Sequence, residues 1–593
     1  MAIASNLVRQ NVRISQQAVT SPVFRIKGQR SRWFYPDQRL TPEHAERMRN
    51  IDISERGVAH SRYGYEPYTE KTLTKDSTSN YTGYSITGLN SVTYADGNNR
   101  RVILGSTVAN PGAGTTKMWN DLGDGGTITE LTGSTNLSAG HDVRFTTAFL
   151  KDKFFIADSY GQVQSWDGNL SNNFVTLAPK EATAGVGSDI FTACKGLFVH
   201  SNGLGVYGTT EGGVYKPTNI RFCNVSLNKS EMWEVDTNIF PQQNLFKCFE
   251  GGAPVVHCID FNGKLLIFKE DGLYTGFVGT TTMGYRNFEF ERTIRGFSPA
   301  GRNSIISRPE FCCGLAKEGI FVITPDLQYQ IINSDDITEF FNLNMFRLDK
   351  AQAMIREADH QVRFYTSSNG DVLDPKVASS GTPLRGGGSA GFDVILVWDW
   401  ETGDTWIDTP SHTVNTISSF VDTDGKQRDW IGALNQTEDG PAYDGNDSTR
   451  INGGNAFGRI YTGNQPSVNE DNGVPYNWQI KMSPNDLGMP GRSKHILNIR
   501  TLYRKRSGQQ KLTFRANVNE GRESAYTEEV SLGTGVAWDQ GESYNKGKKW
   551  PGTGALRADV FVNRVCETIA PEWFSNSPAS IEGYIVEYIP LDS

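Results

Sequence analysis

A glycine- and serine-rich stretch is the first candidate for chemistry, because it matches two catalytic patterns. Residues 386–391 read GGGSAG, which fits the dinucleotide-binding pattern G-x-G-x-x-G and, from Gly387 to Gly391, the nucleophile-elbow pattern G-x-S-x-G. Both patterns work where a strand precedes the glycines and a helix follows them, so that amide groups point at a phosphate or a serine is exposed. Here the glycines precede the strand-like run FDVILVW. We therefore interpret residues 374–391 as a flexible insertion between two strands.

Metal-binding patterns are absent from the sequence. The eight histidines include no HExxH motif and no i, i+4 pair, and the seven cysteines include no CxxC spacing. The Asp/Gly-rich turns at 121–126 and 443–447 lack the spaced carboxylates and terminal glutamate of a calcium loop. We expect no metal and no organic cofactor. The odd number of cysteines indicates isolated buried thiols rather than disulfides.

One turn bears on an enzymatic interpretation. Asp158-Ser159-Tyr160-Gly161, followed by Trp166, approaches the S-x-D-x-G-x-x-W turns of sialidase-type propellers, but one residue too many separates the aspartate from the glycine. Those turns are structural in any case. No repeated array of Arg, Glu and Tyr and no assignable pair of carboxylates indicates a glycosidase pocket.

A basic run near the C-terminus is the clearest candidate for binding. Residues 500–506 interleave an aromatic with cations, as nucleic-acid binders often do. Alternation along a strand would place Arg500, Arg504 and Arg506 on one face, and Tyr503 with Lys505 on the other. We favour an interface with an acidic neighbour over a DNA contact, because no groove-reading helix or RNA-binding fingerprint accompanies the run. Arg500, Arg504, Lys505 and Arg506 are therefore predicted to serve a subunit interface or to touch DNA.

Charge is unevenly distributed along the chain. The whole chain has 58 basic and 66 acidic residues, a net charge of −8, whereas residues 1–62 carry +6 and residues 492–511 carry +7. The remainder therefore carries −21. An acidic body with two basic segments suggests interfaces with acidic partners or contacts with phosphates.

The elements that position these residues are mostly strands. Between residues 81 and 475 the sequence repeats a Val/Ile/Phe/Tyr-rich run, a Gly/Asp/Asn turn and a second such run, as in KGLFVHSNGLGVYG (195–208) and GKLLIFKEDGLYTG (263–276). The repeats are 42 to 69 residues apart, which is enough for about four antiparallel strands each. We predict an all-β fold, an irregular six- or seven-bladed β-propeller over 81–475.

The flanking segments differ from the repeats. Alternating strands at 512–519 and 581–590 predict a C-terminal antiparallel β module over 476–593, and residues 1–80 are expected to form an N-terminal arm or platform segment. Helical signals are few: Thr41-Pro42-Glu43 predicts a short helix over 42–50, and Ser334-Asp335-Asp336 predicts another. No apolar run approaches the roughly 18 residues that span a bilayer, so we expect no membrane insertion.

The stretch NIDISERGVAHSRYGYEPY (50–68) resembles a motif of tail proteins from short-tailed bacteriophages, the tail nozzle or tail hub proteins. The motif residues here are Asn50, Gly57, Arg62, Gly64 and Tyr65. The hairpins at 263–276 and 398–406 and the segment 213–234 are similar to the same group.

This resemblance implies a structural part of the virion and no enzyme. It implies a homohexameric ring below the portal and its adaptor ring, with the propellers outside and a lumen that continues the DNA-ejection channel. The implied partners are the head-tail adaptor ring, a tail fibre protein and, transiently and without sequence specificity, double-stranded DNA in the lumen. The chain would be made in the host cytoplasm and end in the virion tail.

Two alternatives stay open at this stage. One is a propeller-type polysaccharide-degrading enzyme, which should show convergent carboxylates in one pocket on the propeller axis. The other is a glycan-binding adhesin of a phage tail, which should show similar pockets in successive blades.

Overall fold

The chain folds into two compact units, which are described separately. The computed structural model groups residues 1–62 with 477–593, here called the terminal unit, and residues 63–476, here called the propeller unit. The expected N-terminal segment 1–80 is therefore divided between the two units at residue 62. The structure describes residues 18–29, 42–53, 58–68, 85–106, 116–121, 129–131, 137–138, 143–181, 187–227, 233–248, 252–280, 285–332, 343, 345, 347–368, 391–411, 414–422, 425–433, 460–463, 470–471, 475–504, 510–518, 523–532 and 556–591.

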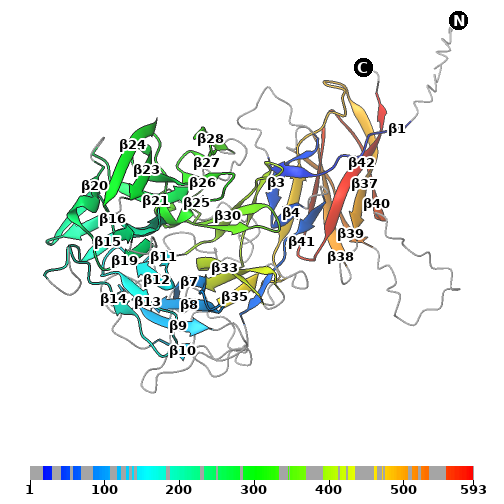
Figure 1. Cartoon of the computed structure of the whole chain (residues 1–593). Coiled ribbons are helices and arrows are strands. Elements are labelled where there is room, and N and C mark those ends of the chain that lie inside the picture. The colour runs from blue at the N-terminus through cyan, green and yellow to red at the C-terminus, as the bar shows by residue number, and fades with distance from the viewer. Residues whose placement is uncertain are drawn as a thin grey trace, which may run out of the picture. The chain divides into compact units, whose positions relative to one another are not determined.

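The described part of the propeller unit contains seven sets of four antiparallel strands, each set here called a sheet (Figure 1). Six are continuous in sequence or nearly so. They are β7 (Ser85–Thr93), β8 (Asn99–Ser106), β9 (Lys117–Asp121) and β10 (Thr129–Glu130); β11 (Thr146–Leu150), β12 (Lys153–Ala157), β13 (Gln164–Trp166) and β14 (Val175–Thr176); β15 (Ala193–His200), β16 (Gly203–Glu211), β17 (Val214–Phe222) and β20 (Leu245–Lys247); β21 (Val255–Phe261), β22 (Lys264–Lys269), β23 (Gly272–Thr280) and β24 (Arg286–Arg295); β25 (Ile306–Ser307), β26 (Cys312–Ala316), β27 (Gly319–Ile323) and β28 (Tyr329–Ile332); and β29 (Gln352–Arg356), β30 (Gln361–Thr366), β31 (Val394–Asp399) and β32 (Thr405–Asp408).

The seventh sheet closes the propeller with a strand from the N-terminal side. It contains β33 (Val414–Val421), β34 (Gln427–Ala433), β35 (Ile460–Gly463) and β6 (Tyr65–Pro67), and β6 pairs with β35. A buried cluster that includes Tyr68, Trp119 and Trp430 joins this sheet to the first one. First strands of neighbouring sheets lie next to one another in five cases: β11 and β15, β15 and β21, β21 and β25, β29 and β33, and β33 and β7. The fold is thus an all-β propeller, as predicted.

The hairpins follow from turn chemistry. Ser201 and Asn202 join β15 to β16 with φ of 49° and 58°, and Asn262 and Gly263 join β21 to β22 with φ of 52° and 76°. Two consecutive left-handed residues make the turn whose twist matches that of antiparallel strands. Small polar residues and glycine tolerate this conformation, which explains why the predicted hairpins start and end where they do.

The terminal unit contains two sheets built from both ends of the chain. One has the order β4 (Ile51–Ile53), β5 (Ala59–Ser61), β42 (Ser580–Pro590), β37 (Lys494–Arg504) and β40 (Leu556–Cys566), and β1 (Val19–Thr20) pairs with β42. In this unit's other sheet the order is β3 (His44–Arg49), β36 (Trp478–Met482), β41 (Ile569–Ser575), β38 (Gln510–Val518) and β39 (Glu523–Leu532), and β2 (Lys27–Gln29) pairs with β3. The strands after residue 476 pair antiparallel with one another, as predicted.

The helix predicted over 42–50 is wrong, because residues 44–49 form strand β3. Pairing with β36 sets Ala45 opposite Met482 and Met48 opposite Ile480, and all four side chains are fully buried. Burial against a strand that is remote in sequence outweighs the local helix signals. The second predicted helix, which follows Ser334, lies outside the described residues.

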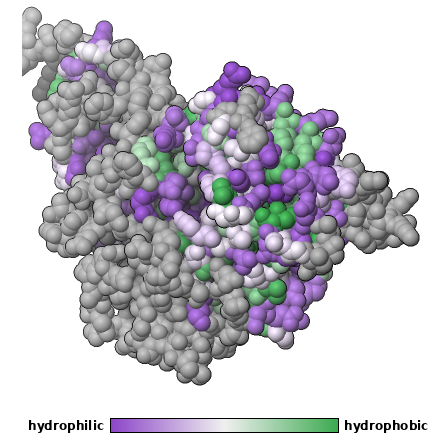
Figure 2. Space-filling view, turned by 90° about the vertical axis from the view of Figure 1, so that its left-hand side faces the viewer, coloured by the Kyte–Doolittle hydropathy of each residue, from purple (hydrophilic) through white to green (hydrophobic). Residues whose placement is uncertain are grey.

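Helical structure in the described parts of the chain consists of three short 3-10 turns, at Gln242–Asn244, Arg302–Ser304 and Leu348–Lys350. No described helix is long and apolar enough to cross a membrane. The face shown in Figure 2 carries mainly hydrophilic residues with small groups of hydrophobic ones between them. Scattered apolar exposure of this kind is normal for a protein surface.

Candidate functional site

A pocket lies among the first strands of the propeller sheets. It has a volume of about 480 Å³, and every sheet contributes lining residues. Representative ones, in sheet order, are Asn90, Thr147, Leu197, His257, Ile306, Met354 and Ser418. The volume falls in the range of about 300–1,000 Å³ that is typical of small-ligand sites. We call this the axial pocket.

Arg302 connects sheets across the axial pocket. Its Nη1 donates to Ser159 Oγ at 2.5 Å and to the carbonyl oxygen of Lys195, and its Nη2 donates to the carbonyl oxygen of Arg144. The next residue, Asn303, donates to the carbonyl oxygen of Phe145 at 3.1 Å. The guanidinium therefore links the fifth sheet to the second and third through three hydrogen bonds.

His257 lines the axial pocket as a neutral imidazole. Burial, and secondarily the charge of Arg302, lower the pKa of His257 to about 3. Its Nδ1 lies 3.3 Å from the hydroxyl of Tyr207 on the neighbouring sheet. Burial also raises the pKa of Tyr207, so this pair is uncharged near neutral pH.

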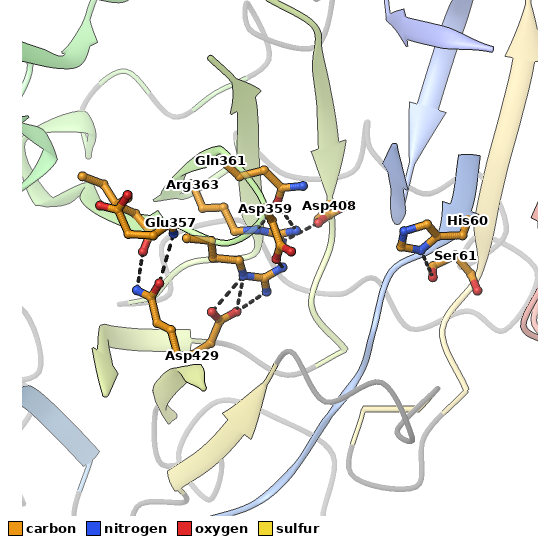
Figure 3. Close-up of polar contacts among 11 residues, drawn as sticks. His60, Ser61, Glu357, Asp359, Gln361, Arg363, Asp408 and Asp429 are labelled. Atoms are coloured by element: carbon orange, nitrogen blue, oxygen red, sulfur yellow. Dashed lines mark hydrogen bonds and ion pairs between the residues drawn. The ribbon is translucent and has the colours of Figure 1, made fainter. Parts of the chain in front are cut away.

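Arginine–carboxylate contacts hold the sixth and seventh sheets together (Figure 3). Arg356 Nε donates to both carboxylate oxygens of Asp429 at 2.8 and 3.0 Å, and its Nη2 also donates to this carboxylate. Both side chains are buried, with exposed fractions of 6% and 2%. Removing Arg356 would leave the buried Asp429 carboxylate without its ion-pair partner, so this contact is structural.

Amide contacts continue the same link toward the axial pocket. Gln427 donates to the carbonyl oxygen of Ile355 at 2.7 Å and accepts from the amide of Glu357 at 3.0 Å. The carboxylate of Glu357 is ion-paired with Arg308. Among the described residues that line the axial pocket, Glu357 is the one carboxylate. These lining residues therefore do not supply the pair of carboxylates that most glycosidases use.

A second buried ion pair lies within the sixth sheet. Arg363 Nη1 donates to Asp408 at 2.8 Å, and Gln361 accepts from Arg363 Nε and Nη2 at 3.1 and 2.9 Å (Figure 3). Arg363 and Asp408 are exposed by 1% and 0%. This arrangement fixes β30 against β32, and Gln361, Arg363 and Asp408 hydrogen-bond to one another.

Glu211 is held ionised at the end of β16. Burial alone would raise the pKa of Glu211. Hydrogen bonds from Arg221, Thr209 and Asn219 together lower it by more, so that the pKa is about 2. Its side chain is 18% exposed, so the ion pair with Arg221 is only partly screened by solvent.

The sialidase-like turn is structural, as interpreted from the sequence. Asp158 Oδ1 accepts from the amides of Tyr160 and Gly161 at 2.9 and 2.7 Å. Trp166 Nε1 donates to the carbonyl oxygens of Asn169 and Asn172, both at 3.1 Å. These groups shape a turn and present no free carboxylate.

The basic run adopts the predicted alternation in its described part. Tyr503 is 5% exposed, whereas Arg504 lies on the outer face with Arg500. Arg500 pairs with Glu587 at 2.9 Å and with Asp559 at 3.3 Å, and Arg504 pairs with Glu582. Lys505 and Arg506 lie outside the described residues.

These ion pairs were not foreseen from the sequence. The partner carboxylates come from β40 and β42, which pair with β37 on its two sides. Nothing in the spacing of the basic run indicates them. The charges of Arg500 and Arg504 are therefore partly compensated within the terminal unit, which weakens a phosphate-binding role for these two side chains.

Two residues of the N-terminal motif form one hydrogen-bonded corner. Asn50 has φ of 54° and is 1% exposed, and Arg62 is 4% exposed. Arg62 Nε donates to Asn50 Oδ1 at 3.0 Å, and the Arg62 amide donates to the Asn50 carbonyl oxygen at 3.0 Å. Asn50 Nδ2 donates to the carbonyl oxygen of Asn477 at 2.6 Å. The corner thus ties together residues 62 and 477, where the chain leaves and re-enters the terminal unit.

Two further motif residues belong to the propeller unit, and Gly57 lies outside the described residues. A Cβ atom on Gly64 would lie 2.1 Å from the carbonyl oxygen of Glu470, so this position requires glycine. Tyr65 is 3% exposed and opens β6, the strand that closes the propeller. The described motif residues therefore have structural roles.

The cysteines and the potential metal ligands of the described residues offer no reactive thiol and no metal site. All seven cysteines are free and buried, and burial raises the pKa of Cys194 and Cys223 to about 12. The described residues include no group of three His, Cys, Asp or Glu side chains that could hold a metal ion. Except for Gly391, the stretch 374–391 lies outside the described residues, as does the turn at 443–447.

The axial pocket itself was not predicted. Its lining residues come from eight separate stretches of sequence, and most are ordinary polar or aliphatic residues of strands. The first strand of each predicted repeat could have indicated the pocket, because the first strands of propeller blades face the central axis.

Comparisons with known proteins identify no family. No family model matches the chain, and no curated protein matches it. Among solved structures, the dihydro-heme d1 dehydrogenase NirN has 10% identity and a TM-score of 0.31, over 62% of this chain and 60% of NirN. BBS1N, solved in complex with ARL6DN, has 11% identity and a TM-score of 0.31, over 68% of this chain and 97% of BBS1N.

The β-propeller domain of Cps50 (Swd1) from Myceliophteria thermophila has 10% identity and a TM-score of 0.30, over 63% of this chain and 99% of that domain. Similarity this distant carries no functional argument. The chain is distantly similar in structure to β-propeller proteins.

Proposed function

We propose that this chain is a structural virion protein, a tail nozzle or hub subunit of a short-tailed bacteriophage. Its ring would form the distal part of the DNA-ejection channel, below the portal and adaptor. The observation that carries the proposal is the division of charge between the two units. The terminal unit has 26 basic and 18 acidic residues, a net +8, and the propeller unit has 32 basic and 48 acidic residues, a net −16.

This division suits a conduit for DNA. Cationic surfaces bind phosphates through counterion release and would slow a moving genome, whereas an acidic surface does not retain it. A basic unit steers docking onto acidic neighbours in an assembly. The ion pairs of Arg500 and Arg504 argue against a strong DNA site, since their charge is already shared with carboxylates.

The motif corner supports the same proposal. Asn50 and Arg62 tie together the two places where the chain passes between the units, and Gly64 and Tyr65 start the strand that closes the propeller. The proposed partners are further copies in a hexameric ring, the adaptor ring, a tail fibre protein and DNA in transit.

Particles of the virus that encodes this chain would test the proposal. We expect an antibody raised against the propeller unit to label the tip of the tail, with six copies of the chain per particle by quantitative mass spectrometry. Labelling of the capsid, or absence of the chain from purified particles, would contradict the proposed role.

A polysaccharide-degrading propeller is the second candidate, and the axial pocket is the observation that favours it. Incubation of the purified chain with host capsule or lipopolysaccharide should then release reducing ends. We expect no release, because the described lining offers one carboxylate that is already ion-paired.

A further inference from the structure

We infer that the end of the axial pocket at Arg302 binds the oxyanion group of a small molecule, a carboxylate or a phosphate. The pocket volume of about 480 Å³ suits a ligand of that size. This inference goes beyond the structural role proposed above and does not depend on it, because every residue that it uses lies within the propeller unit.

The guanidinium of Arg302 keeps donors and charge for a ligand. Of the five N–H groups of a guanidinium, three donate here, to Ser159 Oγ and to the carbonyl oxygens of Lys195 and Arg144. One N–H on Nε and one on Nη2 have no partner among the described residues. All three acceptors are uncharged, and no described carboxylate forms an ion pair with this half-buried side chain. Buried arginines are usually paired, and an oxyanion would supply the missing charge through a charge-assisted hydrogen bond.

His257 adds a neutral donor to the same pocket. Burial, and secondarily the charge of Arg302, lower the pKa of His257 to about 3, so the ring is neutral near pH 7. The hydroxyl of Tyr207 keeps its proton, because burial raises its pKa, and it lies 3.3 Å from His257 Nδ1, to which it donates. The ring proton is then on Nε2, which has no hydrogen-bond partner in the described parts of the chain.

Lys195 brings a second positive charge close to Arg302. Its carbonyl oxygen accepts from Arg302, and the residue is half-buried without an ion pair to any carboxylate that the structure describes. Burial lowers the pKa of Lys195, and the charge of Arg302 lowers it further. Two cations that repel each other and have no carboxylate partner favour an anion beside them.

The carboxylates near these two cations have other partners or are exposed. Asp349 pairs with Lys350 at 3.3 Å, and its side chain is 55% exposed. Asp158 accepts from three backbone amides. Glu270 is exposed, so solvent screens its charge. The positive charge at this end of the pocket is therefore available to a ligand.

Glu357, the carboxylate of the described lining, lies toward the other end of the pocket. A Cβ atom on Gly301, next to Arg302, would lie 2.5 Å from the carbonyl oxygen of Asp349, just before β29 begins. Glu357 directly follows the five residues of β29, which span about 16 Å at about 3.3 Å each. This separation exceeds the screening length of about 8 Å at physiological ionic strength. Glu357 is also ion-paired with Arg308, so it does not neutralise Arg302.

Ligand-observed saturation-transfer NMR titrations of the purified full chain test this inference. The probes are acetate and glycerol 3-phosphate, each with its uncharged counterpart, acetamide and glycerol. Two near-isosteric variants add a carboxylate to the lining: Gln352→Glu, which keeps the acceptor for the amide of Ile417, and Asn90→Asp, which keeps the acceptor for Thr147. The matched control is Asn287→Asp on the exposed face of β24, which changes the net charge equally. Thermal melting establishes that each variant is folded.

We expect at least one of the two anions to bind the wild type and Asn287→Asp equally, and to bind Gln352→Glu at least about tenfold more weakly, because the added charge repels it. Binding of acetate alone or of glycerol 3-phosphate alone supports the inference and identifies the class of ligand. Asn90→Asp should weaken binding in the same direction, and it keeps the test valid if Gln352→Glu fails to fold. Three results would overturn the inference: no binding of either anion at about 10 mM, equal binding of an anion and its uncharged counterpart, or binding that neither pocket variant changes.

Discussion

Replacing Arg302 with methionine should destabilise the propeller unit strongly. Arg302→Met keeps an unbranched side chain but removes the guanidinium that donates to Ser159 and to the carbonyl oxygens of Lys195 and Arg144. A hydrogen bond from a charged group contributes about 1.5–3 kcal/mol, and a carbonyl left without a partner adds a penalty. These groups are only partly buried and their contributions are not additive, so we expect a loss of about 3–5 kcal/mol in the free energy of unfolding.

Urea denaturation followed by tryptophan fluorescence measures this loss. The matched control is Arg295→Met, because Arg295 is exposed at the end of β24. We expect the control to lie within about 0.5 kcal/mol of the wild type, as surface substitutions usually do. If both variants unfold at the same urea concentration as the wild type, Arg302 does not hold the sheets together and our reading of the axial contacts is wrong.

Three further substitutions test other parts of the structure. Gly64→Ala should lower the free energy of unfolding by about 1–3 kcal/mol through overpacking. Gly279→Ala is the control, because its Cβ would lie 3.4 Å from the nearest atom, and it should change this free energy little. Equal melting temperatures of the two variants would contradict the close approach of Gly64 to Glu470. Glu211 has a lowered pKa, so its contribution of up to about 3 kcal/mol is present above the unfolded-state pKa near 4.5 and is lost as pH falls toward 2. The stability difference between wild type and Glu211→Gln should therefore shrink over this window, and a difference independent of pH would refute the assignment. Replacing Arg500 and Arg504 with serine should slow ring assembly in light scattering and leave weak duplex DNA binding unchanged; steeply salt-dependent DNA binding that the variant loses would make this strand a DNA site.

The hairpins of the propeller were predictable because their signals are local. In GKLLIFKEDGLYTG, the turn residues and the alternation of buried side chains lie within 14 residues, and β22 and β23 form there. The number of sheets was harder to predict, because the closing strand β6 has three residues, Tyr65–Pro67, and its partner β35 lies near the other end of the unit. A strand this short has no periodicity of its own.

Non-local contacts explain the remaining differences. The segment 44–49 carries helix-start signals, yet β36 buries Ala45 and Met48 and makes it a strand. The partners of Arg500 come from β40 and β42, so the compensation of its charge could not be predicted from the basic run. In contrast, the motif residues Asn50 and Arg62 were singled out by a resemblance, and the structure gives them a direct hydrogen bond.

Single-particle electron microscopy of the purified full chain distinguishes a ring-forming structural subunit from a monomer. We predict closed rings with six-fold symmetry and a mass of six times 65.6 kDa. Particles that stay monomeric at every concentration and salt tested, also when the adaptor ring is added, would contradict it.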